Sequence, residues 1–168
     1  MTDIHLVSTG QTSNQQNLAA LFWDIQNVKL KSKQLPDFAS KLQKFADCNG
    51  WLDCQNVYYN SQHKNQTIAK KILESLGFKC VNVPCPLKNS ADNQLIADCI
   101  KWVAFNSYSN RIILVLGDWD YAGLICILKA LGKKVIIFAQ RGNASQKLIK
   151  LVGNDNFYFL DELDKLAA

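Results

Sequence analysis

The sequence has no apolar run that approaches the roughly 20 residues a membrane-spanning helix needs. No basic start followed by a long apolar core opens the chain, so we expect no signal peptide. Only two histidines occur, and none of the six cysteines forms a CxxC pair, which argues against a zinc site. The cysteines lie mostly in apolar or amphipathic segments, where free thiols act as small hydrophobic groups. This usage indicates a reducing, cytoplasmic compartment.

The sequence also lacks the signatures of several common α/β proteins. No GxGxxG motif follows its first apolar segment, and the Gly-Lys pair in KALGKKV has no hydroxyl residue after it. These absences exclude a dinucleotide-binding fold and a P-loop nucleotidase. Gln26 stands where a haloacid-dehalogenase phosphatase needs its second aspartate. The segment VNVPCP lacks the acceptor aspartate of a response-regulator receiver.

The 168 residues are enough for one domain with a sizeable core, and they contain no linker or internal repeat. Residues 1–18 are polar and rich in amides, so we expect a flexible tail ahead of a single domain at 19–168. The net charge of +5 either serves solubility or favours an anionic partner such as nucleic acid.

Strand and helix patterns alternate along the rest of the chain. We expect strands at 19–28, 52–59, 78–84, 111–117 and 133–140, helices at 36–50, 63–77, 90–105, 120–132 and 145–153, and a last strand and helical turn within 156–166. Several strands are continuous apolar runs, which is typical of strands buried on both faces. The pattern predicts a parallel sheet covered by helices on both faces, with its binding site at the carboxyl edge.

Acidic and amide side chains follow the strands at that edge. They are Asp24 and Asn27 after the first strand, Asp92 and Asp98 in the helix at 90–105, and Asp118 and Asp120 after the strand at 111–117. If the first strand is central, these segments bring several carboxylates into a small volume, where they repel one another. A divalent cation such as Mg²⁺ or Mn²⁺ relieves the repulsion and can activate a water for attack on a phosphodiester.

Each aspartate also has a simpler interpretation. An aspartate directly after a strand often caps the next helix, which applies to Asp24, Asp92 and Asp118 taken one at a time. Asp120 alone suits the first turn of a helix, where the helix dipole favours acids. Asp98 lies about 240° around the helix from Asp92, so it fits a solvated or capping residue as well as a ligand. Only the joint placement of the aspartates favours a shared metal site.

Three loops at the same expected edge carry basic residues. They supply Lys29, Lys31 and Lys33 after the first strand, His63 and Lys64 after the second, and Arg141 and Lys147 after the strand at 133–140. Phosphate contacts from such loops give affinity for nucleic acid without reading its sequence. Each cluster taken alone fits a solvated surface, and only the shared edge favours binding.

The segments FWDIQNV, ADNQLIAD, VLGDWDY and LGKKVIIFAQ, followed by Ser145, resemble the successive motifs of the NYN domain, a branch of the PIN-like nuclease superfamily. The resemblance covers residues 19–163. It implies a three-layer α/β/α sandwich with a mostly parallel, Rossmann-like sheet, and metal-dependent endoribonuclease activity on RNA. It also implies that the acidic and amide residues above form the site, with Ser145 as a small polar residue near it.

Two positions depart from the family pattern. Leu116 replaces the serine of the SGDxDF-like motif, and Trp119 replaces the small residue between its two aspartates. Trp119 either stacks on a base, as aromatic residues do in single-strand-binding proteins, or packs on the following helix. The basic residue that often precedes the helix aspartate is not in its usual place, and Lys88 is the nearest candidate.

The first hypothesis is therefore a metal-dependent endoribonuclease acting on single-stranded or structured RNA. In it Asp24, Asp92, Asp118 and Asp120 hold Mg²⁺ or Mn²⁺, and Asn27 orients Asp24, a water or a phosphate oxygen. The second hypothesis is a catalytically weak NYN-like module that binds RNA or a protein partner and regulates it. We expect no membrane partner, and both a homo-oligomer and a regulatory protein partner stay open.

Overall fold

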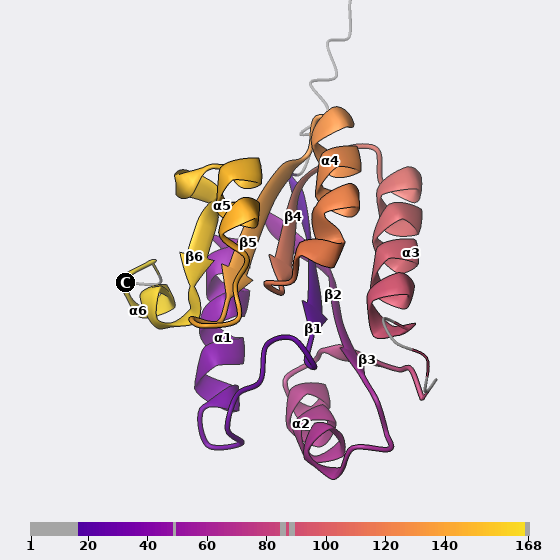
Figure 1. The fold of residues 1–168 in the computed structure, drawn as a ribbon, viewed down its shortest axis with the longest axis vertical. Coiled ribbons are helices and arrows are strands. Elements are labelled where there is room, and N and C mark those ends of the chain that lie inside the picture. Colours follow the sequence, from indigo (N-terminus) through magenta and orange to yellow (C-terminus); the bar gives the residue numbers. More distant parts are fainter. Residues whose placement is uncertain (1–16, 49, 85–86, 88–89, 167–168) are drawn as a thin grey trace, which may run out of the picture.

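The computed structural model describes residues 17–48, 50–84, 87 and 90–166. Most of the expected N-terminal tail, and Lys88, lie outside these residues. The described part contains a six-stranded parallel sheet with helices on both faces, which confirms the expected three-layer α/β/α sandwich (Figure 1). In these ranges no helix combines the length and the apolar character needed to cross a membrane.

The elements follow the alternation that the sequence predicts. The strands are β1 (Leu18–Asp24), β2 (Trp51–Tyr59), β3 (Lys79–Asn82), β4 (Ser109–Val115), β5 (Lys134–Ala139) and β6 (Phe157–Phe159). The helices are α1 (Leu35–Asp47), α2 (Lys64–Ser75), α3 (Ser90–Phe105), α4 (Ala122–Ala130), α5 (Gln146–Val152) and α6 (Leu163–Leu166). Short 3₁₀ turns occur at η1 (Trp119–Tyr121), η2 (Asn154–Asn156) and η3 (Leu160–Glu162).

The sheet has the order β3-β2-β1-β4-β5-β6, so β1 is central as expected. Trp23 on β1 pairs with Val57 on β2 and with Val115 on β4. Because all strands are parallel, Asp24 at the end of β1 lies at the same edge as the loop that follows β4.

Side chains of the central strands alternate between two hydrophobic cores. Ala20 and Phe22 belong to the core beneath α3, α4 and α5. Leu21 and Trp23 belong to the core beneath α1, α2 and α6. Both faces of β1 are therefore buried, which explains why the sequence shows a continuous apolar run instead of alternation.

Several expected boundaries differ from the structure by a few residues, and two of these differences affect the site. The strand expected at 19–28 stops at Asp24, because the backbone carbonyl of Asp24 accepts the N–H of Val28 at 3.1 Å and the chain turns. The helix expected at 120–132 begins with η1, and regular α-helix starts at Ala122. Both shifts put the site residues on tight turns at the sheet edge.

Candidate active site

Two of the expected site aspartates, Asp24 and Asp92, lie on either side of one hydroxyl group; we call them the acid pair. Asp24 ends β1, and Asp92 lies in the first turn of α3. The Tyr121 hydroxyl oxygen is 2.8 Å from Asp24 Oδ2 and 3.0 Å from Asp92 Oδ1. The hydroxyl carries a single proton, so it donates to one carboxylate at a time. Segments far apart in the sequence thus meet at one buried oxygen.

The turn after β1 holds the Asp24 carboxylate in place. Asp24 Oδ1 accepts the backbone N–H groups of Gln26 at 2.9 Å and of Asn27 at 3.4 Å. This leaves Oδ2 for Tyr121. The side chain is only 2 % exposed, so its orientation is set by the protein and not by water.

Burial, helped by the neighbouring Asp92 charge, raises the pKa of Asp24 from 3.8 to about 6, although the hydrogen bonds from Tyr121, Gln26 and Asn27 oppose the rise. Burial and the two nearby carboxylates also raise the pKa of Tyr121, so its hydroxyl stays protonated at neutral pH. The acid pair is therefore an electrostatically costly arrangement that a cation would relieve.

Asn27 joins three loops at this edge. Its Oδ1 accepts the N–H of Gly117 at 2.6 Å, and the Gly117 carbonyl accepts the N–H of Ser145 at 2.8 Å. A Cβ at Gly117 would lie 3.2 Å from Ala144 Cα, so the loops pack closely. Asn27 contacts Asp24 through its backbone N–H. The Asn27 side chain instead binds Gly117 in the loop after β4.

Asp118 and Asp120 lie on the exposed η1 turn that leads into Tyr121. Asp118 Oδ1 accepts the N–H of Asp120 at 3.4 Å, so Asp118 caps the turn, as its simpler interpretation predicts. Both residues are exposed, and Asp120 directly precedes Tyr121, which binds the acid pair.

The Asp98 carboxylate is hydrogen-bonded to one residue of its own helix, α3, and to one residue of β2. Its carboxylate accepts the Tyr58 hydroxyl at 2.9 Å and the Gln94 side-chain amide at 2.9 Å. It lines a separate groove with Lys101 and Trp102. These contacts place the Asp98 carboxylate in a hydrogen-bonding network between α3 and β2.

The donor set suits an open divalent site. Over the described residues, no three Asp, Glu, His or Cys side chains lie close enough together to hold a metal ion. Mg²⁺ is commonly held by one or two carboxylates with water and substrate phosphates completing its shell. The acid pair offers two hard oxygen ligands, so it fits Mg²⁺ or Mn²⁺ in this mode.

Basic residues from the two loops that follow β1 and β2 line a groove, which we call the basic groove. Its volume is about 610 Å³, and it is bordered by Lys29, Lys31 and His63 together with amide side chains that include Gln26. No carboxylate belongs to its lining among the residues that the structure describes. Gln26 lines the groove and also binds Asp24 through its backbone N–H, so this residue is the link between the groove and the acid pair.

The other expected phosphate-binding lysines lie nearby or along the same edge. Lys33 lines a neighbouring groove of about 690 Å³ together with Arg141. Lys64 is the exposed first residue of α2, directly after His63. The expected phosphate-binding residues therefore cover a surface that extends beyond the acid pair.

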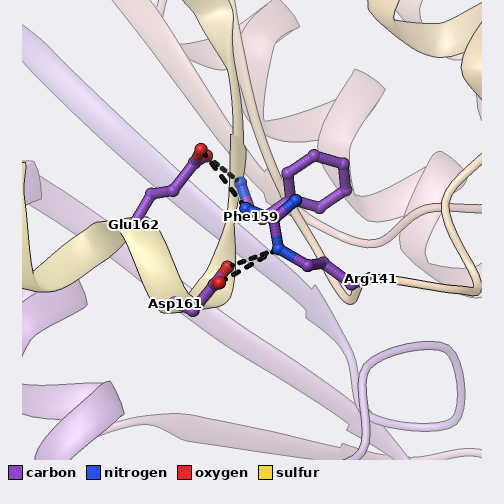
Figure 2. A network of polar contacts seen from close by, with 4 residues as sticks. All are labelled: Arg141, Phe159, Asp161 and Glu162. Atoms are coloured by element: carbon purple, nitrogen blue, oxygen red, sulfur yellow. Dashed lines mark hydrogen bonds and ion pairs between the residues drawn. The ribbon is translucent and has the colours of Figure 1, made fainter.

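Arg141 is held by the C-terminal segment. Its Nε donates to both carboxylate oxygens of Asp161, at 3.1 and 3.0 Å, and its guanidinium lies 4.1 Å from the centre of the Phe159 ring. Glu162 lies 3.5 Å from the same guanidinium (Figure 2). Arg141 lowers the pKa of Asp161. A phosphate would have to compete with these partners for Arg141.

Sequence reasoning misses Tyr121 altogether. In the sequence it looks like an early buried position of the helix at 120–132, and it is indeed fully buried. Its only signal is its place directly after the second aspartate of GDWDY. Which way its hydroxyl points depends on the η1 turn, which the periodicity of the sequence does not reveal.

Comparisons with known proteins agree with this architecture. A family model of the NYN domain matches residues 18–161. No curated protein matches the chain. A crystal structure of a protein of unknown function from Vibrio parahaemolyticus is similar, with a TM-score of 0.70 and 24% identity over 90% of this chain and 97% of that chain. At this identity, the likeness is evidence for the shared fold alone.

Proposed function

Because the chain belongs to the NYN domain family, whose members are generally nuclease-like and bind RNA, we propose that it is a metal-dependent endoribonuclease. The observation that carries the proposal is the acid pair: two carboxylates are held against one hydroxyl at the carboxyl edge of the sheet. Buried like charges are costly, and proteins keep them together chiefly where chemistry requires it.

In this proposal Asp24 and Asp92 hold Mg²⁺ or Mn²⁺ directly, and the exposed Asp118 and Asp120 act through water. A divalent ion bound there neutralises phosphate charge and activates water for attack on phosphorus. We expect the product to keep the phosphate on its 5′ side.

The remaining residues orient these acids. The Gln26 and Asn27 N–H groups fix one oxygen of Asp24, and the Tyr121 hydroxyl fixes the spacing between Asp24 and Asp92. Asn27 also keeps the loop of Asp118 next to β1 through Gly117. Substrate phosphates then bind along the basic groove through Lys29, Lys31 and His63.

A cleavage assay tests the proposal. A labelled single-stranded RNA is incubated with Mn²⁺ or Mg²⁺ and with wild-type protein, Asp24→Asn or Asp118→Asn. Asp155→Asn is the matched control, because Asp155 is exposed on η2, ahead of β6 at the opposite edge of the sheet. We expect Asp24→Asn to lose at least about 100-fold in rate, the usual cost of removing a charge-stabilising group. Equal cleavage by wild type and Asp24→Asn would refute the proposal.

One observation favours a second candidate, a catalytically weak module that binds RNA and regulates it. The described residues offer no third metal ligand beside the acid pair. If this alternative is right, wild-type protein binds RNA, yet added Mn²⁺ gives no cleavage above that of Asp24→Asn.

A further inference from the structure

Trp119 is an exposed aromatic side chain at the rim of the acid pair. It lies between Asp118 and Asp120 on η1, and 41 % of its surface is exposed. Lys147, from the first turn of α5, places its ammonium 5.4 Å from the centre of the indole ring. With 41 % of its surface exposed, Trp119 keeps both expected roles, stacking on a base and packing on the following helix, as predictions.

The turn that carries Trp119 is held by buried or hydrogen-bonded residues on both sides of Trp119. Its neighbour Tyr121 is fully buried and bound to the acid pair. Gly117 directly precedes Asp118, which caps the turn. The Gly117 carbonyl accepts the N–H of Ser145, and Ser145 immediately precedes α5. The same hydrogen bond that anchors the turn thus fixes the start of the helix that supplies Lys147. Trp119 and Lys147 are held together before any ligand arrives.

We propose that Trp119 and Lys147 form a base-stacking subsite for the nucleotide that borders the cleaved phosphodiester. The base stacks on the indole ring, and the Lys147 ammonium binds the adjoining phosphate. Stacking needs only the face of a base, so the subsite tolerates any base. The inference rests on the proposed function for its position beside the reacting phosphate, but the binding it describes is measurable without cleavage.

The subsite selects unpaired bases. In a duplex, both faces of each base are covered by its stacked neighbours, and reaching Trp119 would require the base to leave the stack. A loop or single strand offers the base without that disruption. Trp119 therefore distinguishes single-stranded from duplex RNA, whereas the lysines of the basic groove bind phosphates in both.

Binding is measured in EDTA, which prevents metal-dependent cleavage, by the fluorescence anisotropy of a labelled RNA of about 12 nucleotides, within the range of such binding sites. The proteins are wild type, Trp119→Ala, Trp119→Phe and Lys147→Gln. Trp51→Ala is the matched control, because Trp51 is 66 % exposed at the start of β2, on the opposite edge of the sheet. Thermal melting verifies that each variant folds.

We expect Trp119→Ala to weaken single-strand binding about 5- to 150-fold, the range for loss of one stacked base, and Trp119→Phe to retain most of the affinity. Lys147→Gln reduces the slope of affinity against salt by about one phosphate contact. Trp51→Ala binds as wild type does. For duplex RNA, and for an oligonucleotide whose bases are replaced by abasic sites, Trp119→Ala changes little.

Three results overturn the inference: unchanged single-strand binding by Trp119→Ala, an equal loss on duplex or abasic RNA, or no measurable binding by wild type. Failure of the proposed function looks different. In that case cleavage by wild type and Asp24→Asn is the same, while the Trp119 dependence of binding persists.

Discussion

Asp24→Asn is expected to stabilise the metal-free protein at neutral pH, although it removes an essential group of the proposed site. The basis is the pKa of Asp24, which burial, with the help of the Asp92 charge, raises from 3.8 to about 6. Each tenfold change in proton affinity corresponds to about 1.4 kcal/mol, so the ionised Asp24 costs the folded state about 3 kcal/mol relative to the unfolded chain. Asparagine carries no charge and avoids this cost.

The sign of the pH dependence follows from the raised pKa of Asp24. Below about pH 4 the carboxyl group is protonated in both states, and no penalty exists. As the pH rises through about 6, the unfolded chain has already lost the proton that the folded protein still holds, so wild-type stability falls. The fall is complete by about pH 7. Asp24→Asn has no such dependence, and its side-chain oxygen can still accept the N–H of Gln26.

Thermal denaturation in EDTA at about pH 5 and about pH 7.5 measures the effect. For a chain of this size, 1 kcal/mol shifts the melting temperature by about 2–4 °C. We expect Asp24→Asn to melt about 5–10 °C above wild type at the higher pH and about half as far above it at the lower pH, because the unfolded chain is already ionised at about pH 5 while the folded protein is only beginning to ionise. Millimolar Mn²⁺ should raise the melting temperature of wild type and not that of the variant. A variant that melts at or below wild type at both pH values would show that Asp24 is not electrostatically strained.

Further variants test the surroundings of the acid pair. Tyr121→Phe removes the donor that separates Asp24 from Asp92, so we expect a loss of about 1–3 kcal/mol in unfolding free energy at neutral pH, measured by urea denaturation. Gly117→Ala places a Cβ 3.2 Å from a backbone atom of the next loop and should cost about 1–3 kcal/mol, whereas Gly123→Ala in α4, with nothing within 4 Å, should be neutral or stabilising in the same melts. Asp161→Asn removes a charged partner of Arg141, and we expect tighter RNA binding at low salt, with no change if Arg141 lies off the RNA path.

The layered fold was predictable because strands that are buried on both faces appear in the sequence as continuous apolar runs. The runs around Phe22 and Leu114 lack alternation, and the helices α2 and α4 are followed by the glycines Gly77 and Gly132, both with positive φ. The joint position of Asp24 and Asp92 followed from the parallel topology alone, since β1 is central and α3 begins at its carboxyl edge.

The details of the site were not predictable in the same way. The Asn27 side chain binds Gly117 and not Asp24. This hydrogen bond joins two loops that are 90 residues apart in the sequence. The engagement of Arg141 depends on a C-terminal turn whose acids pair with it only in the folded chain. Such contacts are set by tertiary geometry, which hydrophobic periodicity does not encode.

The hydrogen bonds from Asn27 to Gly117 and from Gly117 to Ser145 bear on how such a site can evolve. They involve one side chain and otherwise only backbone groups, so they do not depend on which side chain stands at the exposed position 119. Substitutions of Trp119 can therefore change which RNAs are accepted while the acids keep their places. Leu116 is fully buried in the core beneath α3, α4 and α5, so a substitution there acts on packing and not on the surface that meets RNA.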